Sequence, residues 1–159
     1  MSAIADRPSV LIVDDDGMVR ELLGAIFTAS GYQCRLATNG MEAIEAFRAE
    51  RPDLSVTDIR MPVLDGLQFL KQALTLEPDA AVLVLTGVGD VQTAVEVLNG
   101  GAYDFIQKPV NPEELLIKAG RALRASPDTS LRGGARWRRA RSSLPSPAAP
   151  TAPGAGGAR

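Results

Sequence analysis

Short apolar runs alternate with longer amphipathic stretches over the first 124 residues. The apolar runs are four or fewer residues long and hold many β-branched side chains, which is typical of strands buried on both faces. They lie at residues 10–13, 34–37, 54–56, 82–85 and 103–106. Between and after them, apolar residues recur three or four positions apart, which predicts helices. These stretches lie at residues 19–27, 41–47, 67–74, 91–98 and 115–123.

Helix-ending and helix-starting residues stand where this pattern needs them. Gly31 follows the first predicted helix, and Gly100 and Gly101 follow the fourth. Asn39 stands three residues before a glutamate, and Asn111 precedes a proline and two glutamates, as at helix N-termini. Five strands alternating with five helices predict one α/β domain, a doubly wound parallel sheet with helices on both faces. We assign it residues 9–124, after a short N-terminal extension at 1–8.

The last 35 residues differ from this domain. Residues 125–159 contain 23 Ala, Gly, Pro and Ser, six Arg and one Asp, a net charge of +5 against −7 for residues 1–124. Such a segment buries too little apolar surface to offset its ordering entropy, so we predict a disordered tail. Weak contact of its arginines and Trp137 with nucleic acid or an anionic membrane is a second interpretation. Readthrough, or truncation of a longer protein, is a third interpretation.

Composition excludes several kinds of chemistry. The sequence has no histidine and one cysteine, Cys34, so a His-based triad, a His-ligated zinc, a phosphohistidine of its own and an internal disulfide are excluded. No apolar run approaches the ~20 residues that span a bilayer. The N-terminus lacks the basic and apolar regions of an export signal, so we predict a cytoplasmic protein without a transmembrane segment.

The candidate chemistry lies at the ends of the predicted strands. Asp14 and Asp15, with a third aspartate, follow the first strand; Asp58 follows the third, Thr86 the fourth and Lys108 the fifth. Ligands of open parallel sheets bind at this edge. Carboxylates ~5 Å apart repel each other by about 3 kcal/mol per pair at an effective dielectric near 20. A hard cation such as Mg²⁺ would relieve that repulsion, and a carboxylate beside a metal and a lysine is a competent nucleophile toward phosphorus.

Four motifs carry a family resemblance that covers roughly residues 8–124. They are Leu-Ile-Val-Asp-Asp-Asp at 11–16, the segment 53–66 that ends in Leu-Asp-Gly, Val-Leu-Val-Leu-Thr at 82–86, and Gly-Ala-Tyr-Asp-Phe-Ile-Gln-Lys-Pro at 101–109. With these motifs the chain resembles a response-regulator receiver domain of two-component signalling, in the CheY-like superfamily. The resemblance implies a flavodoxin-like sheet with strand order 2-1-3-4-5.

The resemblance also implies roles for individual residues. Asp58 matches the phosphoacceptor and a metal ligand. Asp15 matches the acid that binds Mg²⁺ directly, and Asp14 the neighbour that acts through water. The backbone carbonyl of Arg60 matches the remaining protein ligand, and its side chain is expected to point toward the site.

The remaining matched positions concern the response to phosphorylation. Thr86 and Lys108 match the hydroxyl and the ammonium that contact the phosphoryl group. Phe105 matches an aromatic switch residue, which is a tyrosine in many members of the family. The Lys108–Pro109 peptide bond is expected to be cis. Three other residues have structural interpretations only: Asp16 as a surface or cap residue, Asp65 as the start of the third helix, and Cys34 as part of the core or a helix.

These features favour a stand-alone receiver that acts as a switch and not as an enzyme. A histidine kinase or a histidine phosphotransfer protein would supply the phosphoryl group. The output would pass through the fourth helix, fifth strand and fifth helix to a downstream protein. One alternative is the receiver part of a DNA-binding transcriptional regulator without its output domain. Another is a Mg²⁺-dependent phosphohydrolase with an aspartyl nucleophile, although such enzymes usually carry an acid where this chain has Arg60.

Overall fold

The computed structural model describes residues 7–61, 63–87 and 89–125. The predicted tail lies outside the described residues apart from Ala125, which ends the last helix. Most of the predicted N-terminal extension also lies outside them. The described elements follow one another as β1 (Ser9–Val13), α2 (Gly17–Ala29), β2 (Gln33–Ala37), α3 (Gly40–Ala49), β3 (Leu54–Asp58), α4 (Gly66–Leu76), β4 (Val82–Thr86), α5 (Val91–Asn99), β5 (Asp104–Gln107) and α6 (Pro112–Ala125).

The five strands form one parallel sheet in the order β2-β1-β3-β4-β5, which confirms the predicted fold and strand order. Chain order reverses at β1, so β1 and β3 are neighbours although two helices and a strand separate them in sequence. Open α/β sheets bind ligands at such a point, beyond the carboxyl ends of the strands. The topology therefore directs attention to the residues that follow β1 and end β3.

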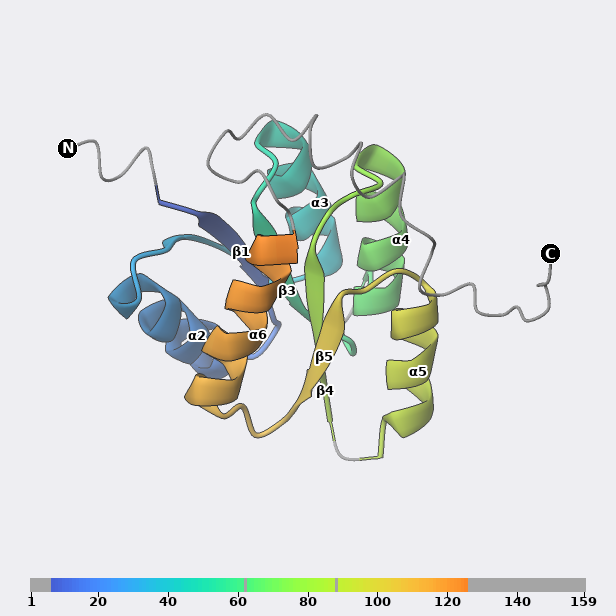
Figure 1. Ribbon diagram of the computed structural model, residues 1–159. Coiled ribbons are helices and arrows are strands. Elements are labelled where there is room, and N and C mark those ends of the chain that lie inside the picture. The colour runs from blue at the N-terminus through green and yellow to red at the C-terminus, as the bar shows by residue number, and fades with distance from the viewer. Residues whose placement is uncertain (1–6, 62, 88, 126–159) are drawn as a thin grey trace, which may run out of the picture.

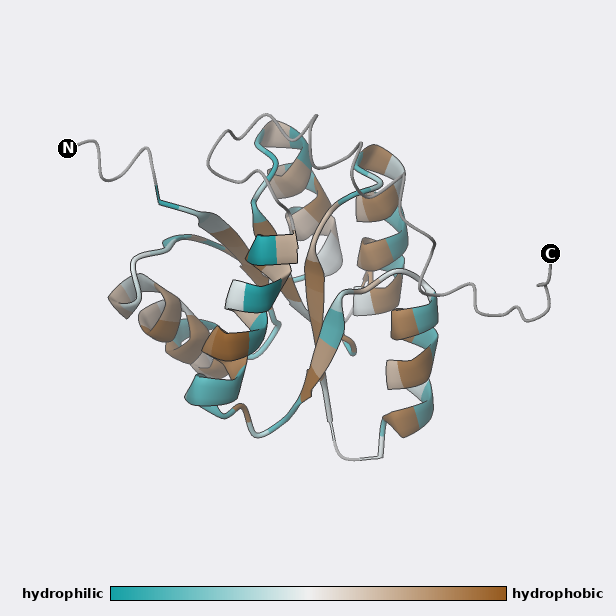
Figure 2. Cartoon of the chain, viewed as in Figure 1, coloured by the Kyte–Doolittle hydropathy of each residue, from teal (hydrophilic) through white to brown (hydrophobic). Residues whose placement is uncertain are grey.

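Helices cover both faces of the sheet, as Figure 1 shows. On one face α2 and α6 pack on β1, β3 and β4; on the other, α3 and α4 pack near β1, and α4 and α5 near β4. Val10 and Ile12 belong to the first core, which lies between the sheet and helices α2 and α6. Leu11 and Val13 belong to the second core, between the sheet and helices α3 and α4. All four side chains are fully buried. Figure 2 shows central strands that are largely hydrophobic and helices with both hydrophobic and hydrophilic residues. Burial on both faces explains why the apolar runs of β1 and β4, at residues 10–13 and 82–85, show no polar alternation.

Local predictions at the helix ends are confirmed. Gly31 and Gly101 have φ of 94° and 113°, a left-handed conformation that glycine adopts freely. Asn39 accepts from the amide of Glu42, and Asn111 from the first turn of α6. The structural interpretations hold as well, since Asp16 caps α2, Asp65 forms a capping box with Gln68, and Cys34 packs against the first core.

Gly66 fixes the distance between α4 and β3. Its amide donates to the carbonyl of Ile59 at 2.8 Å. A Cβ at this position would overlap the backbone carbonyl of Asp58 and lie 2.8 Å from the Cα of Ile59. Only glycine therefore lets the first turn of α4 lie directly against the end of β3, where Asp58 stands.

Among the described residues, no helix is both long enough and apolar enough to cross a membrane.

Candidate functional site

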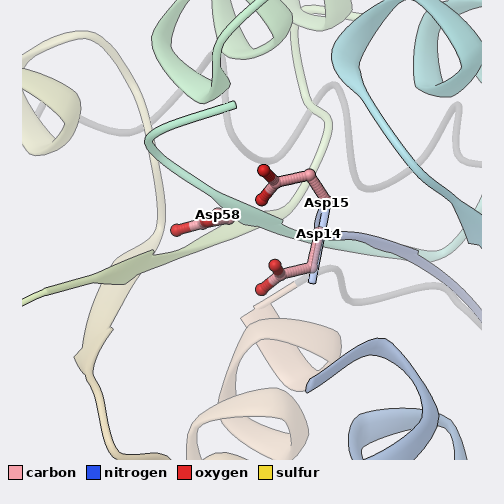
Figure 3. Close-up of side chains that lie close together, drawn as sticks. All are labelled: Asp14, Asp15 and Asp58. Atoms are coloured by element: carbon pink, nitrogen blue, oxygen red, sulfur yellow. The ribbon is translucent and has the colours of Figure 1, made fainter. Parts of the chain in front are cut away.

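The ends of β1 and β3 bring three carboxylates together. Asp14 and Asp15 directly follow β1, and Asp58 is the last residue of β3. One oxygen of each lies within 4.8 Å of the others, and Figure 3 shows the three side chains projecting to the same side. Asp14 is fully buried, Asp58 is 7% exposed, and Asp15 faces solvent. The predicted acidic cluster therefore exists, with one member that solvent can reach.

Lys108 forms ion pairs with two members of this cluster. Its Nζ lies 3.3 Å from Oδ2 of Asp14 and 3.4 Å from Oδ1 of Asp58. The Lys108 amide donates to the carbonyl of Thr86 at 2.7 Å, which ties the backbone of Lys108 to the end of β4. The Lys108–Pro109 bond is cis, as predicted. One ammonium is thus shared between two carboxylates.

The cluster changes the acidity of its members. The pKa of Asp58 is raised to about 6, mainly by burial and next by the charge of Asp14, while Lys108 opposes both effects. Burial disfavours the charged form of Lys108, but the charges of Asp58 and Asp14 outweigh this and raise the pKa of its ammonium. Two buried carboxylates therefore remain incompletely compensated by a single lysine.

The donor set and one unsatisfied atom fit a hard divalent cation. Oδ2 of Asp14 is buried and accepts no hydrogen bond, although Nζ of Lys108 lies at ion-pair distance. A buried carboxylate oxygen without a donor is costly, and a cation would satisfy it. The three residues offer only carboxylate oxygens, the ligand type that Mg²⁺ prefers. Arg60 is the second residue of the loop after β3, so its backbone carbonyl, the fourth predicted ligand, closely follows Asp58 along the chain.

Thr86 and Phe105 lie on neighbouring strands beside the acidic cluster. Thr86 ends β4 and is 2% exposed. The register pairs Val84 with Phe105, and Val84 and Thr86 are two residues apart, so Phe105 lies diagonally from Thr86 on the same face of the sheet. Phe105 is half-buried against the core formed by α4, α5 and β4, and Nζ of Lys118 lies 5.4 Å from its ring centroid. The structure thus places the two predicted switch residues close together.

The side chain of Arg60 has a partner that the sequence did not indicate. Its Nε lies 3.1 Å from Oδ1 and 3.3 Å from Oδ2 of Asp90, and its Nη2 also donates to Oδ1. Asp90 directly precedes α5 and is 5% exposed. An aspartate before a predicted helix is a sequence signal for an N-cap only, so nothing pointed to a contact between these two loops.

Comparisons with known proteins agree with the geometry. The family model for the response regulator receiver domain matches residues 10–119. The regulatory protein AtoC of Escherichia coli (strain K12) is 40% identical over 114 residues, which cover 72% of this chain and 25% of AtoC. The response regulator MprA of Mycobacterium ulcerans (strain Agy99) is 42% identical over 115 residues, 72% of this chain and 50% of MprA.

Solved structures give the same result. A crystal structure of NtrX from Brucella abortus superimposes with a TM-score of 0.73 and 33% sequence identity, covering 87% of this chain and 30% of NtrX. The chain therefore spans between a quarter and a half of the length of these relatives.

Proposed function

The chain belongs to the response regulator receiver domain family, and on that premise we propose that it accepts a phosphoryl group on Asp58 and thereby switches an interaction surface. The observation that carries this proposal is the cluster of Asp14, Asp15 and Asp58, two of whose carboxylates, those of Asp14 and Asp58, share the ammonium of Lys108. The donor would be a histidine kinase or a histidine phosphotransfer protein. The sequence has no histidine, so the donor histidine lies outside it.

Asp58 is suited to the nucleophilic role. Its deprotonated oxygen would attack phosphorus, the bond from phosphorus to the donor imidazole would break, and the bonding electron pair would stay with the imidazole nitrogen. With a pKa of about 6, Asp58 is mostly deprotonated at neutral pH while being more basic than an ordinary aspartate. Lys108, already within 3.4 Å of Asp58, would neutralise charge on the transferred group.

Mg²⁺ would be held by four groups: the carboxylates of Asp14, Asp15 and Asp58 and the backbone carbonyl of Arg60. When bound, it supplies positive charge that offsets the carboxylates and the phosphoryl oxygens. The hydroxyl of Thr86, the last residue of β4, would contact the phosphoryl group. A rotamer change of Phe105 would then carry the change to the surface. The proposal is of a switch, not of an enzyme that turns over many substrates, and it includes a cytoplasmic location.

The output surface proposed from the sequence corresponds to α5, β5 and α6. Its support is a group of large apolar side chains that remain exposed there: Val91 at 70%, Val95 at 50%, Tyr103 at 37% and Ile117 at 49%. Exposed apolar side chains gathered on adjacent elements are typical of protein–protein contact.

The relatives favour one sequence-based hypothesis over another. In AtoC, MprA and NtrX the matched region is one part of a longer regulator. We therefore propose the first alternative above, the receiver part of a DNA-binding transcriptional regulator, in preference to a stand-alone receiver.

Phosphorylation in vitro tests the function directly. Incubation with acetyl phosphate and Mg²⁺ should label the wild-type chain once, and peptide mapping after borohydride reduction should locate the label at Asp58. Asp58→Asn should remain unlabelled, whereas Asp65→Asn, which keeps the helix cap of α4, should label normally. A label mapped to Asp14 or Asp15 in the wild type would overturn the assignment.

A further inference from the structure

The Arg60–Asp90 ion pair joins the two loops that flank the proposed acceptor. Arg60 lies in the loop after β3, whose last residue is Asp58, and Asp90 lies in the turn after β4, whose last residue is Thr86. The guanidinium reaches both carboxylate oxygens of Asp90. The side chains of Arg60 and Asp90 thus connect the loop after the acceptor strand to the residue that directly precedes α5.

The two partners differ strongly in exposure. The side chain of Arg60 is 73% exposed, and that of Asp90 is 5% exposed. The guanidinium keeps most of its contact with water and can leave its partner without being desolvated first. The Asp90 carboxylate is buried, so on losing Arg60 it needs other hydrogen-bond donors.

Other donors exist in the helix that Asp90 precedes. The carboxylate now turns backward and accepts from the amide of Gly87 at 3.0 Å, and no side chain caps α5. The other four helices of the described residues are capped by a side chain, from Asp16, Asn39, Asp65 and Asn111. First-turn amides of an uncapped helix lack partners within the helix, and an aspartate at the N-cap is a preferred acceptor for them. Asp90 therefore has two alternative sets of donors: Arg60 with Gly87, or the first turn of α5.

Charge at Asp58 would decide between these sets. Arg60 is the second residue after Asp58, so a short stretch of backbone keeps its side chain near the acceptor. A phosphoryl group adds nearly two negative charges at neutral pH. Its oxygens also match the planar fork of a guanidinium, which binds phosphate through two parallel hydrogen bonds.

We propose that phosphorylation transfers Arg60 from Asp90 to the phosphoryl group and lets Asp90 turn forward to cap α5. The inference rests on the proposed function of Asp58 and adds a second route from the acceptor to α5, beside Thr86 and Phe105. Arg60 is then a positioning residue, which in the resting protein holds Asp90 away from its helix. The exchange alters the start of α5, where the exposed apolar surface begins.

Solvent-exchange rates of single amides, measured by NMR with and without acetyl phosphate and Mg²⁺, test this exchange. On phosphorylation of the wild type, the Gly87 amide should exchange faster and those of Gln92 and Thr93 slower. Each change should be roughly two- to tenfold, the net contribution of one hydrogen bond. Unphosphorylated Arg60→Gln should already show these rates, because its Asp90 is free to turn.

Two further variants distinguish the exchange from a general loosening. In Asp90→Ala the Gly87 amide should exchange faster than in the wild type. The amides in the first turn of α5 should not exchange more slowly than in the resting wild type, with or without phosphorylation. Arg51→Gln breaks a different inter-loop ion pair, with Glu77 at 2.9 Å at the opposite end of the sheet. It should leave all of these rates at wild-type values.

The outcomes separate this inference from the proposed function. If Asp58 is labelled and the first turn of α5 in Arg60→Gln exchanges at the resting wild-type rate, the partner exchange is refuted and the acceptor assignment stands. If Asp58 is not labelled in the wild type, both are refuted.

Discussion

Replacing Asp58 by Asn should stabilise the metal-free fold at neutral pH, although it removes the proposed acceptor. Asparagine has the same shape and keeps an oxygen for Lys108, which lies 3.4 Å from Oδ1. What it removes is a charge that burial and Asp14 disfavour. The substitution thus isolates the electrostatic cost of assembling the site.

The size and the sign of this effect follow from the pKa of Asp58. That pKa is about 6 in the fold and ~3.9 in an unfolded chain. Between these values the folded state binds more protons than the unfolded state, so the free energy of unfolding falls as pH rises. About two pKa units correspond to at most about 3 kcal/mol lost between pH 4 and pH 7. Asp58→Asn should recover most of this at pH 7.5 and very little at pH 3.5, where the aspartate is mostly protonated in both states.

Urea unfolding in EDTA at constant ionic strength, at several pH values from 3.5 to 7.5, measures the difference. The matched control is Asp16→Asn, which removes a charge from the same edge of the sheet and keeps a residue able to cap α2. It should change stability far less. Saturating Mg²⁺ should raise the wild-type stability and narrow its gap to Asp58→Asn. Equal stability of Asp58→Asn and wild type at pH 7.5, with parallel pH profiles, would refute the idea of a carboxylate cluster strained by its own charge.

Three other predictions follow from the site and its loops. Isothermal titration should show Asp15→Asn weakening Mg²⁺ binding at least tenfold, about 1.4 kcal/mol, and Asp16→Asn changing it little; equal losses would mean that the wrong aspartate was assigned. Thr86→Ala should still accept phosphate, but its phosphorylation should move the NMR signals of Phe105 much less than in the wild type; a full-sized change would exclude coupling through Thr86. Val63 has φ of 71° and is 74% exposed. Because a β-branched residue is strained in this conformation and Asn is not, Val63→Asn should raise the free energy of unfolding by about 1 kcal/mol. Val63→Ala, which keeps the Cβ, should raise it less, and a loss of stability in Val63→Asn would show that the backbone is not strained.

The fold was predictable because the three central strands, β1, β3 and β4, are buried on both faces and each helix is buried on one. The strand ends were predicted less well. The apolar run of β3 stops at Val56, yet the ladder continues through Asp58, which pairs with Leu85. Polar residues at the end of a buried strand look like a loop in sequence, although their backbone still belongs to the sheet. The same polarity that shortened the predicted strand is what identified the site.

The contact between Arg60 and Asp90 marks the limit of such reasoning. The two residues are 30 positions apart, in loops whose relative placement depends on the pairing of β3 with β4. Sequence periodicity fixes which strands and helices exist but not which loop side chains meet. Asp14, Asp15 and Asp58 were accessible to prediction because strand order alone brings them to one edge.

Gly66 has a consequence for how tolerance to substitution is interpreted in this chain. Its contact with the Asp58 carbonyl leaves no room for any side chain, so every replacement must push α4 off the acceptor strand. In a saturation-mutagenesis screen for signalling, position 66 should be as intolerant as the acidic residues, although glycine offers no group for metal or phosphate. Selection there would act on a backbone-to-backbone spacing. A library that varies the helices of the proposed output surface should therefore hold Gly66 constant together with Asp58.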